Sequence, residues 1–410
     1  MCLPSKACRY WKGMVIKMLL SIAYMLLLGM FMGWVCKRLH LPGLLGMILC
    51  GLMLGPHALN VIDASILNIS SQLRRIALII ILLRAGLSLN LEDLKKVGRP
   101  AVLMCFVPAC FEMAGMLLLA PGLSGVTLVD AAIMGAVVAA VSPAVIVPKM
   151  LKLMEEGYGT KQSIPQMILA GASVDDVFVI VMFSVFTGLA QGNAISAGSF
   201  IKIPLSILLG ALTGALIGVT LAKYFEKVHI RDTAKALILL SVSFLLVTGE
   251  DMWSDDIPFS GLIAVMAMGI ALQRNRHIVA KRLSVKFNKL WVAAEIMLFV
   301  LVGATVDLQY ALAAGVNAVI LILGVLLFRM TGVLVCMAGT KLTLKERAFC
   351  MLAYMPKATV QAAIGGIPLS MGLTCGNIVL TVAVLAILIT APLGAFCIDI
   401  TYKKWLQKEN

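Results

Sequence analysis

Apolar runs of about twenty residues recur along almost the whole chain, separated by short segments that carry charged residues, Pro and Gly. Of the 410 residues, 61% are hydrophobic and only 13% are charged, whereas roughly 45 to 50% of residues are apolar in a typical soluble domain. A helix needs about 20 residues to cross about 30 Å of hydrocarbon, so these runs match membrane-spanning helices in length. The sequence therefore excludes a soluble fold and predicts an all-α polytopic membrane protein, with residues 1–410 forming a single transmembrane unit.

Basic residues alternate along the chain in a way that predicts its orientation. Most of the 34 Lys and Arg residues lie in segments that follow odd-numbered spans. Because cytoplasmic segments are enriched in Lys and Arg, we expect the N-terminus outside and the C-terminus in the cytoplasm. The net charge of +14 is explained by this pattern, and no nucleic-acid partner is expected.

Division at charged, Pro and Gly clusters predicts about 13 transmembrane helices, at residues 15–38, 42–59, 73–89, 98–120, 128–150, 164–190, 200–223, 235–249, 258–273, 289–307, 310–340, 346–371 and 376–400.

Two adjacent carboxylates, Asp175 and Asp176, lie near the middle of the predicted span 164–190. A charge at mid-span costs roughly 2.5 to 3.5 kcal/mol even on insertion scales, so such residues are candidates for function. Neighbouring helical positions point about 100° apart, so both side chains can line one cavity wall. Burial favours the protonated form of a carboxylate and a nearby cation favours the ionised form, so the pair can hold either a proton or a small hard cation. A structural ion pair with a buried Lys or Arg is the alternative.

Four of the other charges within predicted spans differ in their expected roles. Glu112 and Arg329 are single opposite charges in otherwise apolar spans, and pairing them is the least costly arrangement. We therefore expect a buried salt bridge, whose role is either structural or in setting ion affinity. Glu295 is expected close to the cytoplasmic lipid interface, and Arg84 near the inner end of its span, where it can snorkel.

Two predicted spans contain helix-breaking prolines. Pro143 and Pro148 interrupt the span 128–150, and Pro356 interrupts the span 346–371. Alignment of the two breaks also matches their neighbours, so the fourth to sixth spans resemble the eleventh to thirteenth. Seven spans separate equivalent helices, and because this number is odd the two halves must enter the membrane in opposite directions. The sequence thus predicts inverted-topology repeats with two crossed broken helices near the midplane, where such proteins bind their substrates.

Several polar residues near the crossing and the acidic pair are candidates for supporting roles. The ammonium group on the second break is expected either to offset negative helix ends or to pair with one of the two aspartates. Hydroxyl groups there can contact an ion or satisfy backbone groups freed by the breaks. These supporting candidates are Lys357, Thr359, Ser142 and Ser173.

Together with the paired aspartates, two motifs resemble the NHA clade of sodium/proton antiporters, within the cation:proton antiporter superfamily. They are Ser142-Pro-Ala-Val and Met355-Pro-Lys-Ala-Thr-Val-Gln-Ala-Ala. The likeness extends over nearly the whole chain, through the segments Leu41-Pro-Gly-Leu-Leu-Gly-Met, Leu83-Arg-Ala-Gly-Leu-Ser-Leu, Glu155-Glu-Gly-Tyr-Gly and Leu298-Phe-Val-Leu-Val-Gly-Ala.

The resemblance implies an NhaA-like antiporter fold and a transporter, not an enzyme. It implies exchange of Na+ or Li+ for H+ by elevator-type alternating access, with no cofactor beyond the transported ions. The metal ion and the proton then compete at Asp176 as the main carrier, with Asp175 assisting. Many electrogenic relatives carry a Lys where this chain has Arg329, so the proton-to-cation stoichiometry stays open.

The resemblance also implies an organisation and a location. A core, ion-translocating domain is expected at about residues 98–190 and 310–400, and a dimerisation scaffold at about 15–60 and 200–307. The expected partners are a second copy of the chain and membrane lipids, anionic on the cytoplasmic side. The expected location is the bacterial inner (plasma) membrane.

Other classes of protein fit the same features less well. An intramembrane aspartyl protease needs its two aspartates on separate helices, so adjacent placement argues against it. A K+/H+ antiporter, a channel-like potassium efflux protein or a sodium-coupled organic anion symporter on the same fold remains open, because fold alone does not fix substrate. The symporter has no need of an Asp-Asp pair.

Overall fold

The computed structural model describes residues 6–39, 41–88, 98–191, 197–253 and 259–408, and within them the regular elements are all helices. In chain order they are α1 (Lys6–Arg38), α2 (Gly43–Leu54), α3 (Ala64–Asn68), α4 (Ser70–Ser88), α6 (Arg99–Met104), α7 (Val107–Ser124), α8 (Leu128–Ala139), α9 (Pro143–Glu156), α10 (Ile164–Ala190), α11 (Ala197–Lys227), α12 (Asp232–Trp253), α13 (Gly261–Asn275), α14 (His277–Ala304), α15 (Leu308–Cys336), α16 (Leu344–Ala353), α17 (Thr359–Ile364), α18 (Ile367–Ser370) and α19 (Gly376–Trp405).

Each of the thirteen predicted spans contains helix, but only nine helical stretches in the described residues are long and apolar enough to cross a membrane by themselves. The other four predicted spans correspond to α2 and α13, which are short, to α4, which carries three arginines, and to the interrupted run α16–α18. The nine are Val15–Arg38, Arg99–Ser124, Leu128–Glu156, Ile164–Ala190, Leu208–Lys227, Asp232–Glu250, His277–Ala304, Gly315–Cys336 and Gly376–Trp405.

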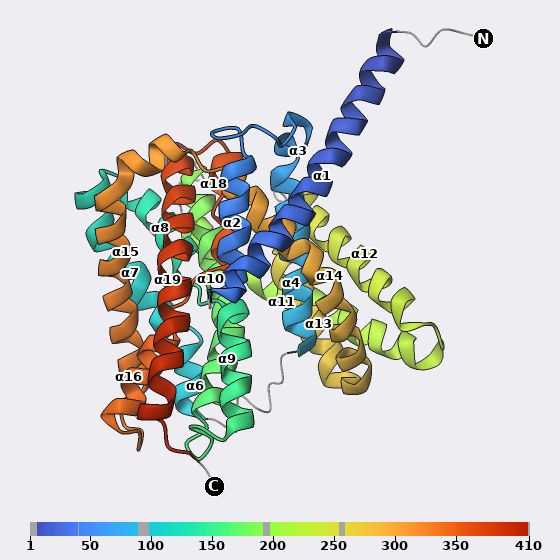
Figure 1. The fold of residues 1–410 in the computed structure, drawn as a ribbon. Coiled ribbons are helices and arrows are strands. Elements are labelled where there is room, and N and C mark those ends of the chain that lie inside the picture. Colours follow the sequence, from blue (N-terminus) through green and yellow to red (C-terminus); the bar gives the residue numbers. More distant parts are fainter. Residues whose placement is uncertain (1–5, 40, 89–97, 192–196, 254–258, 409–410) are drawn as a thin grey trace.

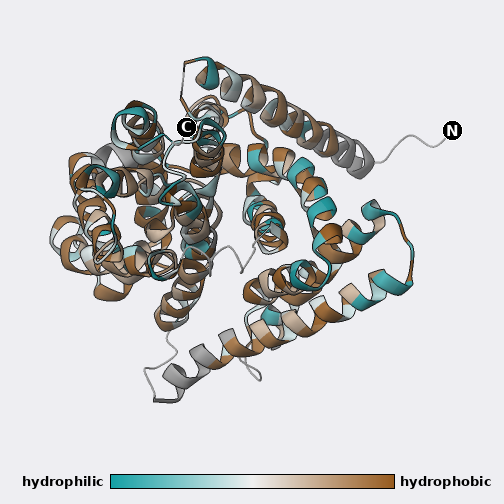
Figure 2. Cartoon of the chain, turned by 90° about the horizontal axis from the view of Figure 1, so that it is seen from below, coloured by the Kyte–Doolittle hydropathy of each residue, from teal (hydrophilic) through white to brown (hydrophobic). Residues whose placement is uncertain are grey.

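The outer surface of the helices is apolar, as a lipid environment requires. Leu208, Leu212 and Leu216 follow one another at four-residue spacing on one face of α11 and are 54%, 58% and 68% exposed. Figure 2 shows that hydrophobic residues dominate the helices throughout, with hydrophilic residues gathered in patches. A water-exposed surface of this kind would be a large apolar patch, so these helices belong in a bilayer. The chain is a multi-pass integral membrane protein.

The helices form two groups that lie side by side in Figure 1. The first group contains α1–α4 and α11–α14, in which α11 packs on α13, and α14 packs on both α2 and α4. The second group contains α6–α10 and α15–α19, in which α7 packs on α15 and α8, and α10 packs on α8 and α9. Short helix α17 contacts α4 and α14 across the boundary between the groups.

Two helices of the second group are interrupted where their sequences carry proline. Between α8 and α9 the chain is extended at Ala140 and Ser142, and Pro143 then starts α9, where its missing N–H has no partner to lose. Pro148, which was also expected to interrupt this span, lies inside α9 instead. Pro356 lies in the gap between α16 and α17. The two breaks touch, because the Ser142 amide donates a hydrogen bond of 2.8 Å to the Pro356 carbonyl. Gly394 of α19 packs against this point, where a Cβ would lie 2.4 Å from Pro356 Cγ.

Candidate functional site

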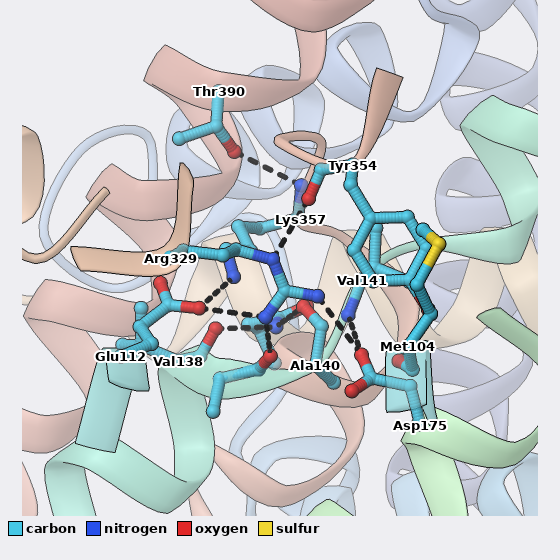
Figure 3. A network of polar contacts seen from close by, with 12 residues as sticks. Met104, Glu112, Val138, Ala140, Val141, Asp175, Arg329, Tyr354, Lys357 and Thr390 are labelled. Atoms are coloured by element: carbon cyan, nitrogen blue, oxygen red, sulfur yellow. Dashed lines mark hydrogen bonds and ion pairs between the residues drawn. The ribbon is translucent and has the colours of Figure 1, made fainter. Parts of the chain in front are cut away.

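A fully buried guanidinium lies at the centre of the crossing, on α15 (Figure 3). Arg329 Nη1 is 2.8 Å from Glu112 Oε2 of α7, and Arg329 Nη2 is 3.0 Å from Asp175 Oδ2 of α10. Its Nε donates a 2.8 Å hydrogen bond to the Tyr354 carbonyl, and its Nη1 also donates to the Ala139 carbonyl. These carbonyls lie at the C-terminal ends of α16 and α8, where helices leave acceptors without internal partners. One arginine therefore joins two carboxylates and both broken helices.

The second buried cation lies on the break itself and contacts a different acid from the ones expected. Lys357 Nζ is 2.5 Å from Glu112 Oε2, and the Lys357 amide donates to Thr390 Oγ1 at 2.9 Å (Figure 3). The structure thus places Lys357 against Glu112, not against Asp175 or Asp176. The guanidinium of Arg329 contacts Oδ2 of Asp175, and Oδ1 of Asp175 has no hydrogen-bond partner.

An amide side chain holds the two breaks together. Gln361 Nε2 donates to the carbonyls of Val138 and Ala140, at 3.1 and 2.7 Å, and its Oε1 accepts from the Ala358 amide at 2.8 Å. Three backbone groups that the breaks would leave without partners are therefore satisfied by one side chain. Gln361 was not among the residues predicted from the sequence, although an amide within an apolar segment indicates a buried polar role.

The two adjacent aspartates have different surroundings. Asp175 is fully buried, and its Oδ2 accepts from the Val141 amide at 2.9 Å as well as from Arg329. Asp176 is 7% exposed and lines a cavity, and its Oδ1 is buried without a hydrogen-bond partner. The expectation that both carboxylates share one cavity wall therefore differs from the structure, in which Asp176 lines the cavity and Asp175 faces the arginine.

Further oxygen atoms near the crossing lack hydrogen-bond partners. Ser142 immediately precedes α9 and Thr359 is the first residue of α17, and the hydroxyls of both are buried and unpaired. Oδ1 of Asp175 and Oε1 of Glu112 are in the same condition. An unpaired buried oxygen is costly, so a group of them is typical of a place that receives a proton or a cation. The side chain of Ser173 lies outside the described residues.

A cavity of about 410 Å³ lies between the two helix groups and reaches Asp176. One wall comes from α9 and α10 of the second group, and the other from α4 and α14 of the first. Glu295 and Arg84, expected at a lipid interface, both line this cavity instead. Both residues are flanked along the chain by apolar residues, so the sequence did not indicate which face of the helix each one occupies. The lining residues are Ile81, Arg84, Ala85, Ser88, Pro143, Ala144, Val147, Pro148, Asp176, Asn288, Trp291 and Glu295.

The chain has relatives among known proteins. Residues 24–404 match the family described as "Sodium/hydrogen exchanger, transmembrane". The chain is 34% identical to Sodium/hydrogen exchanger 9B2 of Mus musculus and of Homo sapiens, over 90% of this chain and 69% and 70% of those proteins. It is 30% identical to Sodium/hydrogen exchanger 9B1 of Homo sapiens, over 90% of this chain and 73% of that protein.

The fold also has a solved counterpart. The structure of the sodium proton antiporter MjNhaP1 from Methanocaldococcus jannaschii superimposes with a TM-score of 0.83, over 95% of this chain and 99% of that chain, at 22% sequence identity. The resemblance drawn from the sequence motifs is confirmed by these matches. The chain belongs to the sodium/hydrogen exchanger family of membrane transport proteins.

Proposed function

We propose that this chain exchanges Na+ or Li+ for H+, with the cation and the proton competing for the carboxylate of Asp176. The observation that carries the proposal is the position of Asp176, which is on the cavity wall with a buried oxygen that has no hydrogen-bond partner. A carboxylate in such a place is stabilised either by a proton or by a small cation, and the two exclude each other. Family membership supports the same exchange.

The charges around Asp176 support binding of one positive charge at a time. With all four groups ionised, Glu112 and Asp175 contribute two negative charges and Arg329 and Lys357 two positive ones, so the four-residue network is balanced without Asp176. Ionised Asp176 then leaves one uncompensated negative charge, which a monovalent cation or a proton neutralises. Asp175 assists by holding the arginine, and the free hydroxyls of the supporting residues Ser142 and Thr359 offer ligands to a dehydrated ion.

Alternating access follows from motion of one helix group against the other. We assign the second group, residues 98–190 and 310–400, to an elevator-type core, and the first group, residues 15–60 and 200–307, to a scaffold that forms the homodimer. Packing on α13 and α14 adds α4 to the scaffold. In this proposal the carrier, Asp176 on α10, belongs to the moving group, as do the two crossed breaks.

Orientation and surroundings belong to the same proposal. The cavity lies near the end of the bundle where α4 ends, α14 begins and the C-terminus is found (Figure 1). We place this end in the cytoplasm, which makes the structure inward-open, with the N-terminus outside. The basic segments there then face anionic lipid headgroups, and a bacterial inner membrane is the proposed location.

Exchange by purified protein in liposomes tests the function. With a pH gradient imposed, addition of Na+ or Li+ is expected to dissipate the gradient, and Asp176→Asn is expected to abolish this. Asp63→Asn is a matched control, because Asp63 caps α3 and Asn caps helices equally well. Exchange by Asp176→Asn at the parental rate contradicts the site. Dissipation by K+ but not Na+ identifies the K+/H+ alternative, and dependence on an organic anion identifies the symporter.

A further inference from the structure

Two charged side chains that the proposed exchange leaves unused lie across the cavity from Asp176. Arg84 of α4 and Glu295 of α14 line the wall formed by the first helix group, and both are half-buried. A charge within the membrane is costly unless it serves a purpose, and here the two side chains border the space through which an ion reaches Asp176. Their positions on the opposite wall make them candidates for control of ion affinity.

Contacts between α4 and α14 fix the depth of each residue in the cavity. Ser88 and Ser284 are joined by a hydrogen bond of 2.8 Å, and Arg84 Cζ lies 5.4 Å from the centre of the Trp291 ring. The helices are therefore antiparallel, and the guanidinium lies about one turn, or about 6 Å, deeper than the serine pair. Glu295 is one further turn along α14, at the deep end of the wall.

Arg84 is held loosely compared with Arg329. Among the described residues, no carboxylate lies within 4.0 Å of its guanidinium, and its defined contact is the face of Trp291, a cation–π interaction. It nevertheless interacts electrostatically with both Glu295 and Asp176. The guanidinium is thus a permanent positive charge, since arginine stays protonated in proteins, placed between two carboxylates on opposite walls.

We propose that Arg84 is a tethered cation that competes with the transported cation for the field of ionised Asp176, and that Glu295 holds it back on the scaffold wall. This inference rests on the proposed function. When Asp176 is ionised and empty, the guanidinium partly offsets its charge, and an arriving ion must overcome that positive field. Arg84 therefore weakens cation binding and favours release into the cavity. It acts on Asp176 without being a ligand of the ion.

The first test compares variants at this position by the KM for Na+ in liposomes. Arg84→Gln removes the charge and is expected to lower KM about tenfold, the effect of a charge interaction of about 1.4 kcal/mol in a partly hydrated cavity. Arg84→Lys keeps the charge and is expected to remain within about twofold of the parent. Lys281→Gln is the matched control, because Lys281 lines a neighbouring cavity whose lining excludes Asp176. A parental KM in Arg84→Gln overturns the inference.

The second test asks whether Glu295 acts through Arg84. Glu295→Gln frees the guanidinium to approach Asp176, so KM is expected to rise about threefold in the parent and to stay unchanged in the Arg84→Gln background. An equal rise in both backgrounds shows direct attraction of ions by Glu295 and contradicts its proposed role. Should Arg84→Gln fail to fold, Glu295→Gln in the Arg84→Lys background carries the test, where an unchanged KM overturns the proposal. Absence of exchange by the parent protein instead refutes the proposed function itself.

Discussion

Two arginines in this membrane protein, Arg329 and Arg84, face the two members of the aspartate pair and are held in opposite ways. Arg329 is fully buried and joins Asp175, Glu112 and two helix-end carbonyls. Arg84 is half-buried beside a cavity and rests on an aromatic ring, in the field of Asp176. One region is dry and densely hydrogen-bonded, whereas the other is open and loosely connected.

The difference between these two arginines, one on α15 and one on α4, predicts different consequences when each charge is removed. A buried ion network has no water to replace a missing partner, so each member is needed for the fold. A charge beside a hydrated cavity can be removed at little structural cost, and the same freedom allows its field to change during transport. We therefore expect variants of the Arg329 region to alter stability, and variants of the Arg84 region to alter ion affinity.

The largest effect is expected from Arg329→Met, which leaves two buried carboxylates with fewer partners. Loss of one member of a buried network costs about 3 to 5 kcal/mol in the free energy of unfolding, so we expect poor yield and a much lower melting temperature in detergent. Arg276→Met, which removes a more exposed pair with Glu226 at 2.9 Å, is the matched control and is expected to cost less than about 1 kcal/mol. Equal melting temperatures for the two variants would remove the distinction between dry and open regions.

Next in size is Gln361→Leu, which keeps the side-chain volume close to that of the parent but leaves three backbone groups at the crossing without partners. Each buried unsatisfied group costs about 1 to 3 kcal/mol, and partial relaxation of the breaks leaves an expected loss of about 2 to 4 kcal/mol. The melting temperature in detergent measures it, with Gln191→Leu at the exposed end of α10 as the control. A loss no greater than that of the control would show that the crossing is held by other contacts.

A smaller effect is expected from Tyr354→Phe. The Tyr354 hydroxyl donates to the Met104 carbonyl at 2.9 Å, while its ring lies 5.0 Å from the Arg329 guanidinium. Phenylalanine retains the ring and loses the hydrogen bond, so the expected cost is about 1 kcal/mol, again from the melting temperature. No change would mean that water or another donor replaces the hydroxyl, and the region would be less dry than proposed.

The smallest effect on stability is expected from Arg84→Gln, although its effect on KM is large. Because the guanidinium is half-buried and has no close carboxylate partner among the described residues, its removal is expected to change the free energy of unfolding by no more than about 0.5 kcal/mol. The melting temperature should match that of the parent within a few degrees. A fall in melting temperature as large as that of Arg329→Met would show that Arg84 is a structural residue and that the two regions do not differ in this respect.

Features that depend on local sequence were predictable. The apolar runs predicted the positions of helices. Pro143 and Pro356 predicted the two breaks, because proline has no backbone N–H to donate to a helical hydrogen bond. The adjacent aspartates were found because charges are rare in such runs. Thirteen crossings were predicted, whereas nine helices in the described residues are long and apolar enough to cross a membrane by themselves. The other four predicted spans correspond to helices that are short, interrupted or charged.

Features that depend on which helix faces which were not predictable. An apolar helix has no polar face to indicate its rotation, so the positions of Glu295 and Arg84 on a cavity wall could not be derived. The partner of Lys357 was missed for a similar reason, because three acids on two helices compete for two cations and only packing decides the pairing. Gln361 and Thr390 were missed because they act on backbone groups exposed by tertiary contacts.

Proton release on cation binding distinguishes competition at Asp176 from independent binding of the two ions. When Na+ is added to purified protein in weakly buffered detergent solution, with no membrane gradient present, cation and proton compete for Asp176 if the account is correct. The parent protein and Asp63→Asn are then expected to release protons in proportion to bound Na+, and Asp176→Asn is expected to release none. Release of protons by Asp176→Asn, or binding of Na+ by the parent protein without any release, would contradict the account.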